Sequence, residues 1–443
     1  MKKIISSVLF SFLFPFVAFS QSADSIPQQK PKEKGPSINI DANMLARGEY
    51  RYGGMPVENT VDNHAAFVMD RLRLSAEFSW GNLSMKITPQ HAGIWGQSNG
   101  GSFNLNEGWM QYATKQGLFF KIGRQALRYD DERIIGSDDW SMMSVTHDVL
   151  KLGYDGKNHH AHAILGFNQN GEKINGGTFY ENGYQPYKSM QTLWYHYDFS
   201  HLPLGVSVVF INTGMQNGDG GEDEEQENKT MNQQLLGGYV KFHPKNFSLE
   251  GSYYRQMGQS EYGLDISAYM ASVKANYTLF SPLTLTAGYD YLSGDERFAV
   301  PGPGQIGLTQ HLKIRGFSSI FGSHHQFYGA MDFFYMQTYV GGFTPGLQNL
   351  YFGADYKPLN NLSLTGNYHY FATAYKLPNF ERTLGHEIEF STSWQFDKYV
   401  AFQAGYTFMS GSETMERLHR TSDKRHLHWL WAQLIFTPKI FQK

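Results

Sequence analysis

The sequence contains no cysteine, and this absence excludes several kinds of structure and chemistry. A chain without thiols has no disulfide framework, no thiolate metal site and no cysteine nucleophile. Charged residues are also scarce, at 17% of the 443 residues, against about 25% in typical soluble domains. The formal net charge of −3 gives no basis for nucleic-acid binding. We therefore expect a charge-poor protein with no nucleic-acid partner.

Long apolar runs are missing after Gln21, so we expect no membrane-spanning helix in the mature chain. The first residues differ from the rest. Lys2 and Lys3 precede an apolar stretch over 4–17, and small residues follow it, which predicts a secretory signal peptide over 1–20. The polar, proline-rich stretch that follows predicts a disordered periplasmic leader over 21–37.

Aromatic residues are abundant, with 28 Tyr and 33 Phe. Tyrosine and phenylalanine at this level are typical of the interfacial girdles of membrane barrels. Apolar and polar residues also alternate in segments of strand length. In residues 66–80, Leu72 and Leu74 share one face, and Arg71 and Arg73 share the other. The same two-residue period recurs in 83–88, 158–168 and 283–291. This pattern predicts transmembrane β-strands.

The connections between these segments alternate between short and long. Tight turns at Gly81-Asn82 and Ser281-Pro282 contrast with long polar segments such as 127–144 and 294–345. A soluble sandwich has no reason to place its long loops at every second turn, whereas an outer-membrane barrel has short periplasmic turns and long extracellular loops. We therefore predict an all-β fold over 38–443, a single transmembrane antiparallel barrel of about 18 strands.

The predicted strands lie near 38–50, 64–80, 83–94, 103–115, 118–126, 145–155, 158–169, 189–200, 204–212, 232–243, 247–258, 264–279, 283–293, 346–356, 361–372, 383–395, 400–410 and 427–437. Residues 325–337 also resemble a strand. Counting this segment as a strand would give an odd number of strands and would place the short turn at 357–361 outside the cell. Because single-chain bacterial barrels have even numbers of strands, we assign 317–345 to an extracellular loop. That loop is predicted to fold over or into the lumen.

Eighteen strands leave a water-filled channel, because side chains cannot fill so wide a lumen. Fixed cations with interspersed acids would guide an anionic solute and still let it leave. The candidate path residues are Arg71, Arg73, Lys86, Lys121, Arg124, Arg128, Arg133, Lys151, Glu387 and Glu389. Alternatively, these charges only solvate the lumen, and Arg133, Asp131 and Asp139 form a salt-bridge network that fixes their loop.

Four other patterns carry little weight. Residues 302–307 satisfy a G-x-G-x-x-G string but follow no strand–turn–helix unit. His160 and His162 share a face without an evident third metal ligand. The acidic run 222–227 lacks calcium-loop spacing, although a calcium-bridged contact with lipopolysaccharide is an alternative. Glu387 and Glu389 on one strand do not form a glycosidase pair. We expect no enzyme activity, no cofactor and no metal.

One segment resembles a known family. LFFKIGRQALRYDDERIIGSDDW at 118–140 resembles the signature of the alginate export family of outer-membrane barrels. Weaker similarities are RLRLSAEFSWGNLSMKI at 71–87, THDVLKLGYDG at 146–156, LTAGYDYLSGDE at 285–296, FGSHHQFYGAMDFFY at 321–335 and LGHEIEF at 384–390. The resemblance implies an eighteen-stranded barrel whose lumen is lined by Arg and Lys for a polyanionic sugar. It assigns that role to Arg71 or Arg73, Arg124 and Arg133, and to Lys151, where the family usually has Arg.

The expected function is a passive channel in the outer membrane of a Gram-negative bacterium for an anionic polysaccharide or oligosaccharide, with loops 127–144 and 294–345 gating the mouth. One alternative is a general or small-anion porin serving uptake. Another is a non-conducting barrel, plugged by its loops and serving adhesion. The expected partners are outer-membrane lipid and lipopolysaccharide, the barrel-assembly machinery, the anionic saccharide and periplasmic secretion partners.

Overall fold

Eighteen strands follow one another along the chain, and each is antiparallel to the next. In this computed structural model they are β1 (Ser37–Tyr52), β2 (His64–Trp80), β3 (Leu83–Ile94), β4 (Ser102–Ala113), β5 (Leu118–Gln125), β6 (His147–Asp155), β7 (His159–Phe167), β8 (Ser189–Asp198), β9 (Leu204–Gln216), β10 (Thr230–Phe242), β11 (Phe247–Gln259), β12 (Asp265–Phe280), β13 (Leu283–Leu292), β14 (Leu347–Leu359), β15 (Leu362–Ala372), β16 (Thr383–Asp397), β17 (Val400–Gly411) and β18 (His426–Phe436). Three shorter elements are η1 (His324–Gln326), α1 (Glu413–His419) and β19 (Lys439–Gln442).

The structure describes residues 35–53, 64–172, 174, 178–181, 183–217, 229–295, 313–334, 344–419 and 426–443. The predicted signal peptide over 1–20 lies outside these residues, as does most of the predicted leader over 21–37. The acidic run 222–227 and residues 302–307 also lie outside them. The strands and the loops between them belong to one compact unit over Pro36–Lys443.

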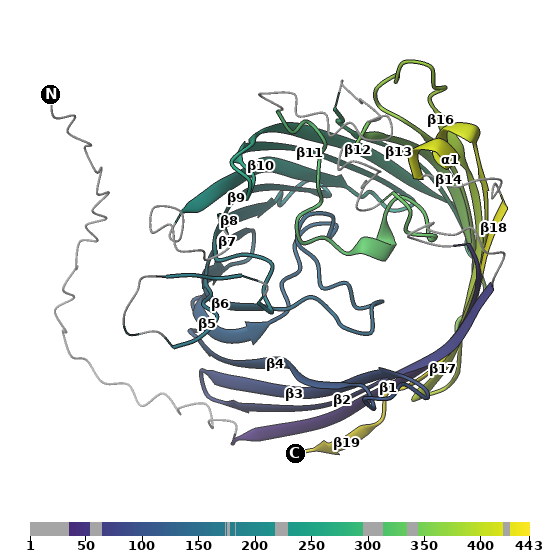
Figure 1. Ribbon diagram of the computed structural model, residues 1–443. Helices are drawn as coiled ribbons and strands as arrows, with labels where there is room; N and C mark the ends of the chain where they lie inside the picture. The colour runs from purple at the N-terminus through teal and green to yellow at the C-terminus, as the bar shows by residue number, and fades with distance from the viewer. Residues whose placement is uncertain are drawn as a thin grey trace, which may run out of the picture. The chain divides into compact units, whose positions relative to one another are not determined.

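The sheet closes on itself, as Figure 1 shows. β1 pairs with β2 along one edge and with β18 along the other, in a register that runs from Met44↔Phe436 to Tyr52↔His428. β19 continues beside β1 beyond the end of β18. Because each of the strands β1–β18 has two neighbours, the barrel has no unpaired edge and its backbone groups bond between strands. The predicted eighteen-stranded barrel is confirmed.

The two faces of the strands meet different surroundings, as the alternation predicts. On β2, Leu72 and Leu74 are each 46% exposed on the outer surface, whereas Arg71 and Arg73 are buried on the lumen side. On β16, Phe390 is exposed outside and Glu387 is buried inside. In the part of the chain that the structure describes, no helix is long and apolar enough to cross a membrane.

The strand-like segment 325–337 is not a barrel strand, as predicted. β13 pairs directly with β14, from Leu283↔Tyr356 to Leu292↔Leu347, so no strand is inserted between them. Residues 313–334 instead form an irregular segment that contains only η1. This segment and the loop between β5 and β6 both lie inside the ring of strands (Figure 1).

Candidate functional site: a lumen narrowed by two inward segments

The first inward segment is the loop over 126–146, between β5 and β6. Leu127, Ile134 and Ile135 are buried in it, so the loop has an apolar core of its own. Asp130 and Glu132 adopt left-handed φ values of 55° and 61°, which turn the backbone sharply. Non-glycine residues in this region store strain, and the contacts around them must hold it in place. The loop is therefore a packed element inside the barrel.

Arg71 and Arg73 hold this loop against the wall. Arg71 Nη1 donates to the backbone carbonyls of Asp139 and Ser141 at 2.9 and 3.0 Å. Arg73 Nη1 bonds Asp139 Oδ1 at 2.5 Å, and its Nη2 donates to Ser144 Oγ at 2.9 Å. Both arginines face the lumen as predicted. Their donors are engaged by the loop, so they anchor it.

The second inward segment, 313–334, packs on the first. Phe321 N donates to Ile134 O at 3.0 Å, and Gly136 N donates to Phe321 O at 2.7 Å. These bonds form a short parallel bridge between Ile135 and Phe321. The two segments therefore form one connected structure across the lumen.

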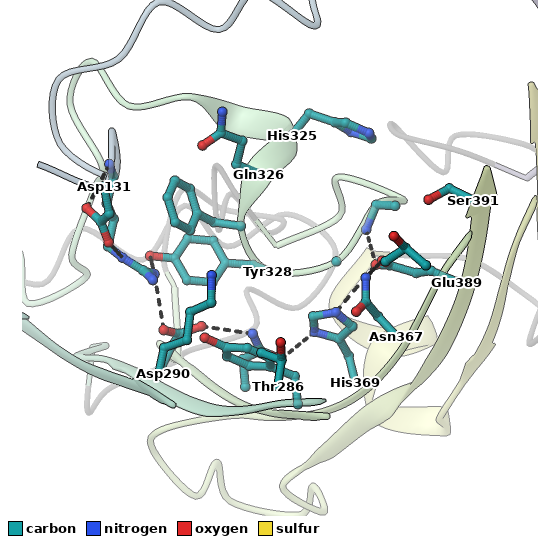
Figure 2. Close-up of a pocket in the computed structure, with 18 of the residues that line it drawn as sticks. Asp131, Thr286, Asp290, His325, Gln326, Tyr328, Asn367, His369, Glu389 and Ser391 are labelled. Carbon is teal, nitrogen blue, oxygen red and sulfur yellow. Dashed lines mark hydrogen bonds and ion pairs between the residues drawn. The ribbon is translucent and has the colours of Figure 1, made fainter. Parts of the chain in front are cut away.

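Arg133 is the centre of a buried network, and Figure 2 labels its partners Asp131, Asp290 and Tyr328. Its Nη1 lies 3.1 Å from Asp290 Oδ1 on β13, and it also donates to Tyr328 Oη at 3.0 Å. Its Nε lies 3.2 Å from Asp131 Oδ2, and its guanidinium is 4.2 Å from the Phe327 ring centroid. Burial alone would lower the pKa of Arg133, but nearby acidic groups, Asp290 first, raise it well above its usual value. Arg133 therefore joins both inward segments to the wall as a permanent cation.

This geometry favours the predicted salt-bridge network over a solvent-facing role for Arg133. Asp131 belongs to the network, whereas Asp139 pairs with Arg71 and Arg73 instead. The two-residue period of 283–291 places Asp290 on the polar face of its strand, but nothing in the sequence connects it or Tyr328 to Arg133.

Glu387 and Glu389 face the lumen as predicted, and they hold the second segment. Glu389 Oε1 accepts a bond from Ala330 N at 2.7 Å, and Glu387 Oε1 accepts one from Met331 N at 3.2 Å. Asn367 Nδ2 donates to Glu389 Oε2 at 2.9 Å. The bond from Ala330 N to the Glu389 carboxylate is charge-assisted, and such bonds are among the stronger hydrogen bonds. The two glutamate side chains therefore anchor a loop.

A cavity of about 430 Å³ lies between the second segment and the wall formed by β10–β18 (Figure 2). Its ionisable lining residues are Asp131, Arg133, Glu250, Lys274, Asp290, Asp355, His325, His369 and Glu389. Five carboxylates thus face two permanent cations. Aromatic groups, among them Tyr351 and Trp431, complete the lining. The cavity has the size of a small-molecule site.

The opposite wall carries a cationic patch formed by Lys121 and Lys151. The two residues face each other across the β5–β6 ladder. Lys121 Nζ lies 3.7 Å from the Trp109 ring centroid, and Lys151 Nζ lies 5.1 Å from that of Tyr129. No carboxylate oxygen of a described residue lies within 4.0 Å of either ammonium nitrogen. Lys86, in contrast, is paired with Glu107.

Arg124 does not line the lumen, which corrects its prediction as a path residue. It has the same parity on β5 as Phe120 and Ile122, both of which are about half exposed on the outer surface. Its guanidinium forms two 2.8 Å bonds with Asp148. Arg128 lies in the inward loop, where it donates to Ser137 Oγ at 2.7 Å.

The histidines considered as metal ligands have other partners. His160 Nδ1 and His162 Nε2 lie 2.9 and 3.1 Å from the same Asp155 oxygen. His159 faces outward and pairs with Tyr195 Oη at 2.8 Å. Among the residues that the structure places, no group of three potential ligands is arranged to hold a metal ion.

The comparisons with known proteins connect this barrel to porins of known structure. No family model and no curated protein matches the chain. Three similar structures are Pseudomonas aeruginosa OccK2 in complex with glucuronate, a BenF-like porin from Pseudomonas fluorescens Pf-5, and Acinetobacter baumannii OccAB1, each with a TM-score of 0.60. Their identities are 11%, 10% and 12%; they cover 91%, 91% and 93% of this chain and 98%, 99% and 99% of their own.

At these identities the likeness concerns the fold. Together with the apolar outer surface, it shows that the chain has the eighteen-stranded barrel fold of these outer-membrane porins. The predicted membership of the alginate export family is not supported, because no family model matches and the similar structures are Occ and BenF-like porins.

Proposed function

We propose that this barrel is a passive porin for small anionic solutes. The observation that carries the proposal is the Lys121–Lys151 patch. Like charges directly opposite each other on adjacent strands destabilise a sheet. A wall that keeps such a pair, with no carboxylate of the described chain in ion-pair range, attracts an anion from the lumen. The aromatic rings beside both ammonium groups supply weaker, cation–π stabilisation.

The inward segments favour a small solute over a polysaccharide. They cross the lumen as one connected structure, and the cavity beside them holds about 430 Å³. Small-molecule sites usually enclose about 300–1,000 Å³, whereas an extended polymer needs a continuous wide passage. OccK2, which shares this fold, has been solved in complex with glucuronate, a single sugar that carries one carboxylate. We infer that the solute is of this size and charge.

Passage would depend on weak binding at opposite walls. The lysine patch raises the local concentration of anions, and the carboxylates of the cavity repel them and so prevent tight retention. A solute with one carboxylate and several hydroxyl groups could exchange water for the neutral polar side chains of the cavity. The rate would then follow the concentration gradient, without a chemical step.

Reversal potentials in planar bilayers under a salt gradient test the proposal. Removing an ammonium about 5 Å from a passing anion costs about 1–3 kcal/mol for effective dielectric constants of about 80 to 20. We therefore expect Lys121→Gln/Lys151→Gln to reduce the anion-to-cation preference at least fivefold. Lys115→Gln, in the exposed turn between β4 and β5, is the matched control and should leave it unchanged. Equal selectivity in all three proteins would contradict the proposal.

Current block separates the competing functions. Millimolar glucuronate should reduce the current of the wild type and have less effect on the double variant. Block by polyuronate alone would support the polysaccharide channel instead. A folded barrel that gives no current would support the plugged adhesion barrel.

A further inference from the structure

The sulfur atom of Met143, in the inward loop between β5 and β6, has polar neighbours. Its Sδ accepts hydrogen bonds from Gln90 Nε2 at 3.2 Å, from Asn104 Nδ2 at 3.5 Å and from Ser102 Oγ at 3.8 Å. Gln90 lies on β3, and Asn104 and Ser102 lie on β4. Methionine usually fills gaps in apolar cores, and its thioether is only a weak acceptor. Three donors from the barrel wall therefore converge on an atom that satisfies them poorly.

Met143 is also open to water. Its side chain is 39% exposed, and its loop lies inside the ring of strands (Figure 1). Among the described residues, Met44, Met85 and Met110 are exposed to a similar extent, but strand parity places all three on the outer, lipid-facing surface. A small polar reagent that enters the lumen therefore reaches the sulfur of Met143 more easily than those of the outward methionines.

The donors of this site are connected to the contacts that hold the loop. Gln90 is 1% exposed, and its Oε1 accepts a bond from Arg73 Nε at 2.5 Å. Arg73 in turn bonds Asp139 and Ser144 of the same loop. Because Gln90 bonds both Arg73 and Met143, a change in the acceptor that Met143 offers acts directly on the docking of the loop.

We propose that Met143 is a site of oxidation by hydrogen peroxide, and that its sulfoxide strengthens the docking of the inward loop. A lone pair of Sδ attacks one oxygen of the peroxide, so that the S–O bond forms as the O–O bond breaks. The departing hydroxide takes the proton of the transferred oxygen and leaves as water. The sulfur loses two electrons and the peroxide gains two, so the step needs no further reactant. Methionine sulfoxide reductases reverse this oxidation state.

The sulfoxide supplies the acceptor that the three donors lack. Oxidation turns an apolar side chain into a polar one, and in an apolar core this change disrupts packing. At Met143 the neighbours are instead the amide N–H groups of Gln90 and Asn104 and a hydroxyl group. A buried donor without a good acceptor costs free energy, and Gln90 Nε2 is such a donor. The oxidised loop should therefore gain hydrogen bonds to β3 and β4. This inference is independent of the solute that passes the barrel.

Hydrogen exchange of the full chain in lipid vesicles, before and after mild treatment with hydrogen peroxide, tests the proposal. Mass spectrometry of peptides from the same samples locates the oxidised methionines. We expect Met143 to be oxidised severalfold faster than its less exposed neighbour Met142. The amides of Ser141 and Val145, which are hydrogen-bonded within the loop, should then exchange at least fivefold more slowly.

The two adjacent methionines provide matched variants. Met143→Leu keeps an apolar side chain of similar volume and removes the reactive sulfur, so peroxide should leave the exchange of its loop unchanged. Met142→Leu keeps Met143 and should respond like the wild type. Asn104→Leu/Ser102→Ala removes two of the three donors and should lose most of the slowing, even when Met143 is fully oxidised. Unchanged exchange of the strands shows that each variant has folded.

Three results would overturn the proposal. The first is a Met143 that stays reduced while Met142 is oxidised. The second is unchanged or faster exchange of the loop in the oxidised wild type, and the third is an equal slowing in Met143→Leu. All three concern the loop and not the passage of a solute, so they are distinct from a failure of the small-anion proposal.

Discussion

Replacing Arg133 with methionine would test how the lumen is kept narrow. Arg133 and Asp290 are both almost fully buried, at 3% and 2% exposure, and their side chains meet at 3.1 Å. Methionine retains an unbranched apolar stem and removes the guanidinium. Among the partners that the described residues offer, Asp290 would then keep only its bond from Asn349 Nδ2, at 2.9 Å. The substitution therefore leaves a buried carboxylate without its cation.

The substitution destabilises the docking of the two inward segments against the barrel wall. Removing one partner of a buried ion pair typically costs about 3–5 kcal/mol. The strand ladder does not include Arg133, so the barrel itself should remain intact, whereas the docking of 126–146 and 313–334 weakens. At about 1.4 kcal/mol per factor of ten, the undocking equilibrium shifts by roughly a hundredfold to a few thousandfold.

Single-channel recording in planar bilayers detects this shift. We expect Arg133→Met to increase the mean conductance or to add large, slow current fluctuations. Arg133→Met/Asp290→Asn removes the uncompensated charge as well and should recover part of the wild-type behaviour. The control is Arg128→Met, which replaces an exposed arginine of the same loop. It should give the same conductance and the same current fluctuations as the wild type. The reasoning is refuted if Arg133→Met, properly folded, matches the wild type in both conductance and noise.

Two further changes act on the same inward segments. Phe334 is fully buried with its ring centroid 4.4 Å from that of Phe371, so Phe334→Ala should cost about 3–5 kcal/mol in docking. Hydrogen exchange should then show faster exchange in 313–334 with unchanged strands, whereas unchanged protection of 313–334 would contradict the assigned packing. Burial lowers the pKa of His324 below its usual 6.5, so docking is fully favoured above about pH 6.5 and weakens as the pH falls toward the lowered value. Current fluctuations should therefore grow from about pH 7 to about pH 5 in the wild type and stay level in His324→Gln; equal pH profiles in both would argue against this residue.

The sequence predicts the direction of a strand side chain better than it predicts its partner. Alternation correctly placed Arg71, Lys121, Lys151, Glu387 and Glu389 on the lumen side, because a period of two allows only two directions. The same rule excludes Arg124 from the lumen wall. Arg124 comes three positions after the lumen-facing Lys121, so its side chain must point to the outer face of the strand.

The paths of the inward segments could not be predicted in the same way. Residues 126–146 and 313–334 are far apart in the sequence and meet through single contacts such as Phe321 N to Ile134 O. No local period encodes such contacts. Tyr328, for example, reaches Arg133 from a left-handed backbone conformation with φ of 64°. The roles of Arg71 and Glu389 followed from these paths, so the sequence assigned both residues to a solute path when they hold loops.

The distribution of partners, rather than the number of charges, therefore distinguishes structural cations from candidate solute contacts. On the described parts of β1–β6, the lumen-facing Arg47, Arg51, Arg71, Arg73 and Lys86 all have acidic partners. Lys121 and Lys151 have aromatic neighbours instead. A cation–π contact leaves the charge available to a third group, whereas an ion pair largely cancels it. A chain of nearly neutral net charge can thus keep a locally positive wall, because the other lumen-facing cations of β1–β6 are neutralised by the loops and strands that they hold together.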